Sequence, residues 1–571
     1  PSIDGTYDLG STTYEWEDLW IDGTANIDSL IADTADINGG TIDGTAIGAT
    51  TPSTGVFSTV VGNTSVTSPI VNATTALQIN GTALSLNHLS DVLVADGSLY
   101  LGHDPTSTDS TAQYNIAVGA TALDAVTTGD GNIAIGHNAL GASTTSEYTI
   151  GIGVGAGAAI TSDNTKGTYI GYNAGTSVTS GAENILIGYE TGDALTSGGS
   201  NVAIGNLALS AEDGHGRNVA VGARALMTLN AGTDSYNTAV GYYAGKAINT
   251  GVRNTITGGN AGIAINSGGH NTLFGYGAGY AITTGGSNVA VGSSALASED
   301  TGNYSVAVGY GSLSAQNNDS DNYNTAVGHN SGLLVNSGTL NTLIGARAGD
   351  ALTSGSYNVA VGYAALGAEN AHGYNTAIGY RALTAQDAGA DTYNVAVGSD
   401  AGKQVSTGYN NTLIGGRSGQ ATTVGRDNVF VGTDAGYTNV DGSRSVGIGY
   451  RALYLQEPSG ATDTYNIGVG YNAGGAISTG VQNICIGGSA GDSIQSGQRN
   501  VVIGYNADTS GSTGTNVMIF GANAAGHGDN IIVLGNADHL AIHPGDDNGV
   551  DLGSGSYSFK DAYIQGSLKI G

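Results

Sequence analysis

A short motif, Asn-Thr-Ala-Val-Gly or a close variant of it, recurs about every 17 residues between residues 98 and 535. Well-matched copies begin at Asn115, Asn237, Asn288, Asn358 and Asn411. A fixed period of this size is typical of a solenoid, in which one structural unit is stacked on itself many times. The repeat therefore overrides the length of 571 residues, which alone would suggest several globular domains.

The composition fits thin, closely stacked layers and excludes several partners. The chain has 97 Gly but only 6 Pro, 5 Phe, 2 Trp and 2 Met, so small and β-branched residues must fill its interior. The formal net charge of −31 argues against a nucleic-acid partner, because phosphate binding needs clustered Lys and Arg. No apolar run is long enough to cross a membrane, so we expect no membrane insertion. The one cysteine, Cys485, lies inside a repeat and is expected to be a small core residue.

The sequence of one coil predicts its shape. The coil NTAVGYYAGKAINTGVR, at 237–253, has two short extended runs, NTAVG and AGKAINT, separated by corners that contain Gly. Gly and β-branched residues recur too often for a helix and fit strands bounded by turns. We therefore predict an all-β chain: a β-solenoid, or parallel β-roll, with two strands per coil, about 17 residues per coil and about 25 coils. With stacked strands about 4.7 Å apart, the roll would be on the order of 120 Å long.

Each residue type in the motif has an expected role. The Gly that ends the motif should turn a corner that needs a positive φ, as at Gly119, Gly241, Gly292 and Gly362. The Asn side chains should form a ladder that links successive coils. Tyrosines beside the motif are expected to stack into further ladders at the corners.

The two faces of the motif differ in the size of their side chains. The fourth residue is nearly always Val or Ile and the second is Thr, Val or Ile, and we expect both to face the interior. The third residue is usually Ala, as at Ala117, Ala239 and Ala360, and would then face outward. A small apolar outer face needs a cover, and further copies of the chain are the simplest one. The elongated fibre is therefore expected to be a homotrimer.

Four coils carry extra residues and predict larger loops on one flank. The extra residues follow the motifs at Asn218, Ser305, Asn375 and Ser445. Insertions on one face of a solenoid often mark a binding face, although tolerated surface variation explains them equally well. Asp319 and Asp321 lie in one such loop and are candidate Ca²⁺ ligands, because Ca²⁺ prefers oxygen donors. A solvated loop is the alternative, and we expect no other cofactor.

The motif resembles the repeats of two kinds of trimeric fibre. SVAVG at Ser305 and SVGIG at Ser445 resemble the core repeat in the heads of trimeric autotransporter adhesins. The form YNTAVGYxAG is more similar to repeats in bacteriophage tail fibres, and so are flanking segments at 39–60, 83–94 and 551–570. Both resemblances imply an extracellular homotrimer with left-handed parallel β-rolls.

A matching module brackets the roll. DLGSTTYEWEDLWIDG at 8–23 matches DLGSGSYSFKDAYIQG at 551–566, which predicts small β modules at both ends. We therefore divide the chain into an N-terminal module (1–28), an irregular or β shaft segment (29–97), the roll (98–536) and a C-terminal module (537–571).

Five residues in the C-terminal module are candidates for binding. His539 and His543 are candidate metal ligands, because a trimer would bring three copies of each together; a structural role is the alternative. Tyr557, Phe559 and Tyr563 are candidate glycan contacts, because aromatic rings often stack on sugars; core packing is the alternative.

These features predict a structural fibre of a phage tail, a rigid trimeric spacer and adhesin on the virion that is not an enzyme. Its partners would be other tail or fibre proteins at its ends and a glycan or protein receptor on the host surface. The alternative is the head or stalk of a bacterial surface adhesin.

Two further functions are disfavoured. A tailspike that degrades polysaccharide needs paired carboxylates in a groove, and here acids such as Glu212 and Glu299 are expected in shallow, solvated loops. No catalytic residues are therefore assigned. Ice binding needs an exposed array of Thr, whereas the Thr position of the motif is assigned to the interior.

Overall fold

The structure is a computed structural model that describes residues 22, 24, 78–79, 82–83, 92–102, 111–162, 165–538, 561 and 563–566. Contacts divide the chain into two units, Pro1–Leu84 and Ser85–Gly571. In the first unit, β1 (Gln78–Ile79) and β2 (Thr82–Ala83) form an antiparallel pair. Most of both terminal modules lies outside the described residues, so the proposed module boundaries stay predictions.

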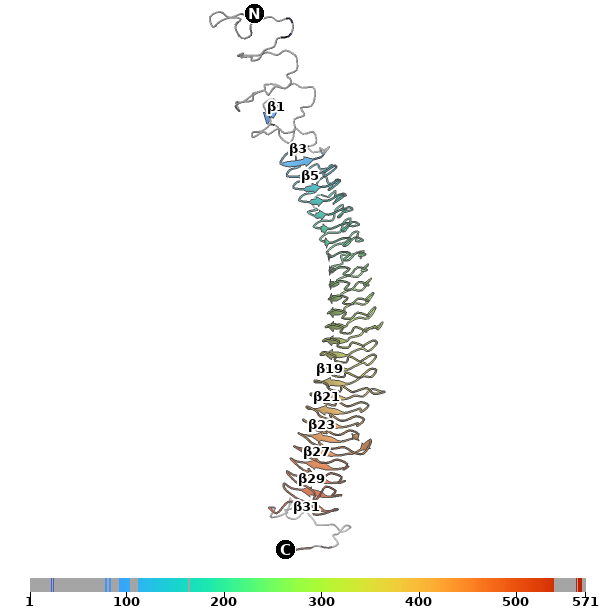
Figure 1. The fold of residues 1–571 in the computed structure, drawn as a ribbon, viewed down its shortest axis with the longest axis vertical. Helices are drawn as coiled ribbons and strands as arrows, with labels where there is room; N and C mark the ends of the chain where they lie inside the picture. The colour runs from blue at the N-terminus through green and yellow to red at the C-terminus, as the bar shows by residue number, and fades with distance from the viewer. Residues whose placement is uncertain are drawn as a thin grey trace, which may run out of the picture. The chain divides into compact units, whose positions relative to one another are not determined.

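One long parallel sheet dominates the second unit (Figure 1). It starts with a hairpin in which β3 (Val92–Ala95) pairs antiparallel with β4 (Ser98–Leu101). After β4, each coil adds one strand of three residues that pairs in parallel with the strand of the coil before it. The predicted β-solenoid is confirmed, with about 25 turns of about 17 residues each. The described residues contain no helix.

The strands that follow β4 in this sheet are β5 (Ile116–Val118), β6 (Ile133–Ile135), β7 (Ile150–Ile152), β8 (Thr168–Ile170), β9 (Ile185–Ile187), β10 (Val202–Ile204), β11 (Val219–Val221), β12 (Thr238–Val240), β13 (Thr255–Thr257), β14 (Thr272–Phe274), β15 (Val289–Val291), β16 (Val306–Val308), β17 (Thr325–Val327), β18 (Thr342–Ile344), β19 (Val359–Val361), β20 (Thr376–Ile378), β21 (Val395–Val397), β22 (Thr412–Ile414), β23 (Val429–Val431), β25 (Val446–Ile448), β27 (Ile467–Val469), β28 (Ile484–Ile486), β29 (Val501–Ile503), β30 (Met518–Phe520) and β31 (Ile532–Leu534). Two loops add a short parallel pair, β24 (Gly442–Ser443) and β26 (Thr462–Asp463).

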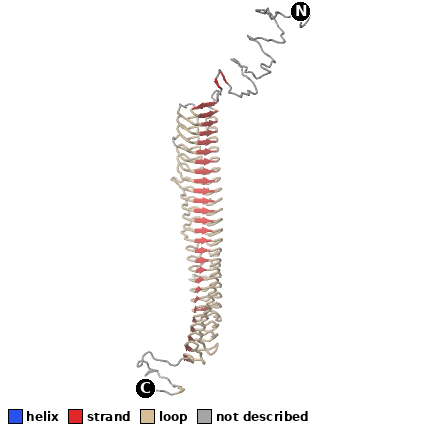
Figure 2. Cartoon of the chain, turned by 90° about the vertical axis from the view of Figure 1, so that its left-hand side faces the viewer, coloured by secondary structure: helices blue, strands red, loops and turns tan. Residues whose placement is uncertain are grey.

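Each coil contains one strand, and the prediction of two is wrong. In the coil that starts at Asn237, the second run, AGKAINT, is a series of turns. The backbone is left-handed at Tyr243 (φ 59°), just before this run, and at Gly245 (φ 56°) within it, which a regular strand cannot accommodate. The strands therefore form a single column along one side of the rod, and turns build the other sides (Figure 2).

The predicted assignment of the two sheet faces is also wrong. The third residue of the motif faces the interior, because Ala117, Ala239 and Ala360 are fully buried. The second and fourth residues face outward and are half-buried or exposed; Ile344, for example, is 40% exposed. The physical reason is a narrow interior, because the chain passes from each strand directly into tight turns. These turns leave little room on the inward side of the strand.

Two interior positions of the coil share one volume: its third and ninth residues, counted from the motif Asn. Where the ninth residue is Leu, as at Leu366, the third is Ala or Gly, as at Ala360. Between residues 167 and 491, a third residue larger than Ala, such as Phe430, is always combined with Gly at the ninth. A Cβ on Gly436 would lie 2.5 Å from the Phe430 ring, so no larger residue fits there. This complementarity is what dense interior packing requires.

The predicted asparagine ladder is confirmed. The backbone N–H of Asn254 donates to Oδ1 of Asn237 at 2.9 Å, and its Nδ2 donates to the carbonyl of Gly268 at 2.9 Å. The first bond links two coils, and the second closes a coil from the inside. The buried amides are therefore satisfied, as buried polar groups must be.

The corner glycines also have the predicted positive φ, for example 139° at Gly241 and 135° at Gly292. A Cβ on Gly241 would lie 2.6 Å from the carbonyl oxygen of Gly258 in the next coil. Backbone stacks directly on backbone at this corner, so no side chain can be accommodated.

Candidate functional site

The outer side of the sheet carries two parallel ranks of side chains, from the second and fourth residues of the motif, which we call the outward stripe. Most of these residues are Val, Ile or Thr. Members that are more than a third exposed include Ile116, Ile135, Ile185, Ile204, Phe274, Ile344, Ile378, Ile414, Ile448 and Ile486. A long, largely apolar surface with interspersed Thr is a candidate interaction surface.

Tyrosines flank the strand column at both ends of the strands. One rank occupies the residue before the motif Asn, and the other occupies the residue after the corner Gly. In the first rank, Tyr374 stacks on both Tyr357 and Tyr393, with ring centroids 4.9 Å apart in each pair. In the second rank, Tyr363 stacks on Tyr380 at 5.6 Å. The predicted tyrosine ladders are confirmed, and these rings remain about half exposed.

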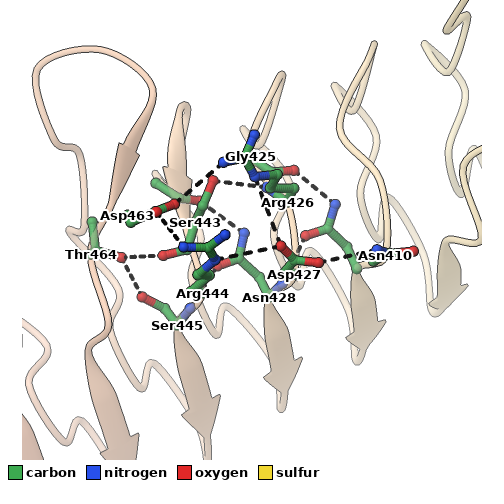
Figure 3. A network of polar contacts seen from close by, with 12 residues as sticks. Asn410, Gly425, Arg426, Asp427, Asn428, Ser443, Arg444, Ser445, Asp463 and Thr464 are labelled. Carbon is green, nitrogen blue, oxygen red and sulfur yellow. Dashed lines mark hydrogen bonds and ion pairs between the residues drawn. The ribbon is translucent and has the colours of Figure 1, made fainter.

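In several coils a polar residue takes the place of tyrosine in the first rank, and Asn410, Asp427 and Arg444 do so in three successive coils (Figure 3). Asn410 donates to Asp427 at 3.1 Å, and Asp427 lies 3.7 Å from Nε of Arg444 in the next coil. Arg444 also pairs with Asp463 and donates to the Tyr465 hydroxyl at 2.6 Å. Exposed ion pairs contribute at most about 1 kcal/mol each, so this network shapes the flank more than it holds the rod together.

Three glutamates interrupt the core at the twelfth residue of the coil, where most coils have Val, Ile or Leu. Glu212, Glu299 and Glu369 are fully buried, which corrects the expectation that Glu212 and Glu299 lie in solvated loops. Burial raises the pKa of each of the three carboxyl groups above its ordinary value. The sequence signal for their burial was the apolar residue that occupies the twelfth position in most of the other coils.

The environments of the three glutamates differ. Glu299 is satisfied on both oxygens: Oε1 accepts the N–H of Gly302 at 2.7 Å, and Oε2 accepts the amides of Gln316 and Asn322 at 2.8 and 2.9 Å. At Glu212 and Glu369, by contrast, Oε2 has no hydrogen-bond partner among the described residues.

Each of these two glutamates is paired with a histidine three residues further on. Oε1 of Glu212 accepts the backbone N–H of His215 at 3.0 Å and lies 3.5 Å from its Nδ1. Oε1 of Glu369 accepts the backbone N–H of His372 at 3.0 Å and lies 3.6 Å from its Nδ1. Neither Nδ1 atom has a hydrogen-bond partner within the described parts of the chain. Both sites thus have one carboxylate oxygen and one imidazole nitrogen without a partner, on side chains that lie next to each other.

The loop aspartates proposed for Ca²⁺ instead contact the preceding coil. The Thr301 hydroxyl donates to Asp319 at 3.0 Å, and Nδ2 of Asn303 donates to Asp321 at 3.0 Å. In the described residues, one group of three His, Cys, Asp or Glu side chains is close enough to hold a metal ion: Glu212, Asp213 and His215.

The candidates in the C-terminal module are largely untested. His539, His543, Tyr557 and Phe559 lie outside the described residues. Tyr563 is described and is 95% exposed, so its ring is accessible to solvent. The metal and glycan roles assigned to this module therefore stay predictions.

A surface hollow of about 620 Å³ lies on the turn side of the roll, lined by Thr228, Lys246, Ala247, Asn249, Ala264, Asn266 and Thr283. This lining does not supply the paired carboxylates of a glycoside hydrolase. Cys485 is fully buried, and burial raises the pKa of its thiol to about 12, which fits the core role expected of it.

No family model matches the sequence, and none of the curated proteins searched matches it. In the described part of the chain, no helix is long and apolar enough to span a bilayer.

Proposed function

We propose that this chain is a rigid segment of an extracellular fibre of the kind carried by phage tails, a spacer and adhesin that catalyses no reaction. The observation that carries the proposal is the uninterrupted stack from β4 to β31, in which backbone pairing joins every coil to its neighbours. About 25 turns at ~4.7 Å per turn give a rod of about 120 Å. The flanking sequence modules support the assignment to a phage tail.

The proposed assembly is a homotrimer whose chains pack on one another's outward stripes. The interface therefore moves from the third-position alanines, which are interior, to the second and fourth positions of the motif. A stripe of about 25 rungs spaced ~4.7 Å apart, each three residues or ~10 Å wide, has an area of about 1,200 Å². In a trimer each stripe is shared between two partners, about 600 Å² to each, so each pair of chains buries about 1,200 Å² in total, at the lower end of the range for stable interfaces. The adjacent tyrosines fit the enrichment of aromatic residues in interfaces.

The assembly is tested by placing charge on the outward stripe of the full chain. Light scattering should give a trimer for the wild type and a monomer for Ile344→Lys/Ile414→Lys, with an unchanged circular dichroism spectrum. Thr250→Lys/Ser267→Lys, at exposed turn residues, is the matched control and should remain trimeric. A monomeric wild type contradicts the trimer. A stripe variant that still assembles contradicts this interface.

The biological role is tested by electron microscopy with antibodies raised against the roll. Label along the tail fibres of virions is expected. Label on bacterial cells that carry no virions would instead favour the bacterial surface adhesin. Release of reducing sugar ends from host capsule would contradict the non-enzymatic role and favour a tailspike.

One observation favours a second candidate, ice binding. The Thr position of the motif faces outward, so the ground for disfavouring ice binding is removed. The stripe is nevertheless mixed: in the strands from β5 to β31, Thr occupies both outward positions in one coil only, at Thr255 and Thr257. This composition favours a protein partner, and a thermal hysteresis measurement on the full chain separates the two functions.

A further inference from the structure

We infer that Glu212, Asp213 and His215 form a binding site for a divalent transition-metal ion such as Zn²⁺, and that Glu369 and His372 form a second, weaker copy of it. The inference is independent of the proposed fibre function. It starts from a repeated sequence, AEDGHG at 211–216 and AENAHG at 368–373. In both cases the next coil is extended to 19 residues.

The same backbone contacts hold the two loops. The carbonyl of His215 accepts Nδ2 of the ladder residue Asn201 at 3.3 Å, and the carbonyl of His372 accepts Nδ2 of Asn358 at 3.1 Å. The next residues, Gly216 and Gly373, donate their N–H groups to aspartates of the following coil at 3.1 and 3.0 Å. Each histidine is thus fixed relative to the ladder, and its glutamate is fixed in the core. Two loops far apart in the chain therefore present the same pair of side chains.

The donor atoms have a spacing that suits a metal ion. One ligand atom each from Glu212, Asp213 and His215 lies within 4.8 Å of the others. Nδ1 of His215 and Oε1 of Glu212 are 3.5 Å apart, close to the ~3.4 Å between two ligands of a tetrahedral ion with bonds of ~2.1 Å. Imidazole together with carboxylate is a donor set that suits Zn²⁺ and its neighbours, whereas Ca²⁺ prefers oxygen alone.

Glu299 provides the comparison inside the same molecule. It occupies the same position of the coil but has no histidine three residues further on, and the amides of Gln316 and Asn322 satisfy its Oε2. Where the histidine is present, the buried Oε2 and the imidazole Nδ1 both lack hydrogen-bond partners among the described residues. Leaving a buried polar atom unsatisfied is costly, so a bound ion explains why the two unsatisfied atoms occur together.

The two sites should differ in affinity. The first has Asp213 beside Glu212, while the second has Asn370, a neutral side chain, at the corresponding position. Loss of one carboxylate ligand should weaken binding by at least about tenfold, because even the loss of a partner outside the ligand shell costs 10- to 100-fold.

The experiment uses the full chain, stripped with a chelator and dialysed against ZnCl₂, with bound metal measured by atomic emission. The wild type should bind two more ions per chain than His215→Gln/His372→Gln. Asp213→Asn should weaken the tighter site to the level of the weaker one, and Asn370→Asp should strengthen the weaker one. Glu299→Gln is the matched control and should bind like the wild type.

Binding to other parts of the chain is excluded by a spectroscopic readout. Co²⁺ in place of Zn²⁺ should give visible absorption bands in the wild type that Glu212→Gln/Glu369→Gln removes, and circular dichroism checks that each variant is folded. Equal zinc content in the wild type and the double histidine variant would overturn the inference. So would an unchanged Co²⁺ spectrum in the double glutamate variant.

Discussion

Along the inward face of the sheet, the third residue of the motif ranges from Gly447 through Ala360 and Leu186 to Phe430. Along the outward face, the second and fourth residues stay almost entirely within Val, Ile and Thr. Inward variation is compensated inside the same chain, because the ninth residue adjusts to the third. The outward residues have no such compensating position in their own chain, so uniform β-branched side chains on a flat pleat are what a repeating partner surface requires.

The largest expected effect contrasts two phenylalanines, one on each face. Phe430 is buried and Phe274 is 58% exposed. Phe430→Ala leaves a cavity and should lower the free energy of unfolding of its coil by about 3–5 kcal/mol. In a monomeric chain, Phe274→Ala should lower the free energy of unfolding by less than about 1 kcal/mol. Hydrogen exchange in the two coils measures both, and equal losses would contradict the assignment of the faces.

The next contrast is between neighbours in one coil, the inward Asn341 and the outward Thr342. Asn341→Ala removes the acceptor of the Asn358 N–H at 3.0 Å and the donor to the Gly355 carbonyl at 2.9 Å. With both buried groups unsatisfied, the loss should be about 2–4 kcal/mol. Thr342→Ala should change the melting temperature little. Thermal unfolding followed by circular dichroism compares them, and the ladder has no stabilising role if the two variants melt together.

A third prediction tests the shared volume directly. Gly436→Leu should clash with the Phe430 ring and destabilise the coil by about 1–3 kcal/mol. The double variant Phe430→Ala/Gly436→Leu reproduces the Ala360 and Leu366 pair of another coil and should recover most of that loss. Leu366 has a φ of 54°, so Leu accepts the left-handed backbone of this position. If the losses of stability from the two single substitutions simply add in the double variant, the two positions do not share one volume.

The smallest expected effect concerns pH. Burial raises the pKa of Glu299 above its ordinary 4.5, so the folded chain holds this proton more tightly than the unfolded chain. The contribution of protonated Glu299 to the stability of the folded chain is therefore complete below pH 4.5. It is lost as pH rises through the raised pKa of Glu299. Because Gln cannot ionise, the melting temperature of Glu299→Gln should fall less between pH 4.5 and neutral pH than that of the wild type. If the melting temperatures of the two proteins change equally with pH, the carboxyl group of Glu299 does not contribute to the pH dependence.

The sequence predicted the period, the parallel sheet, the asparagine ladder and the corner glycines, because each has a local physical cause. It did not predict which face of the motif is inward, because both faces are apolar and alternation alone gives no direction. The information was present in pairs of positions: Leu366 occurs with Ala360, and Gly436 with Phe430. In each coil, one of these two side chains is small where the other is large. Side chains that compensate for each other in this way must touch, so the third residue had to face the interior.

The second strand was predicted wrongly and the proposed metal site was missed, for different reasons. The run AGKAINT has the composition of a strand, but the left-handed backbone at Tyr243 and Gly245 depends on tight stacking that no single coil reveals. In the sequence, His215 and His372 each lie next to Gly and are far apart in the chain, so neither forms a histidine pair with the spacing of metal ligands. Their common spacing from Glu212 and Glu369, in two coils that are followed by extended ones, was the available signal.

The asparagine ladder and the corner glycines also bear on how such a gene changes length. Most coils present the same amide, and all present the same bare corner backbone, to the coils above and below them, and in a solenoid each coil contacts only its neighbours. Removal or duplication of one whole coil by recombination would leave two compatible surfaces in contact. The rod can therefore be lengthened or shortened in steps of one rung, without any redesign of its interior.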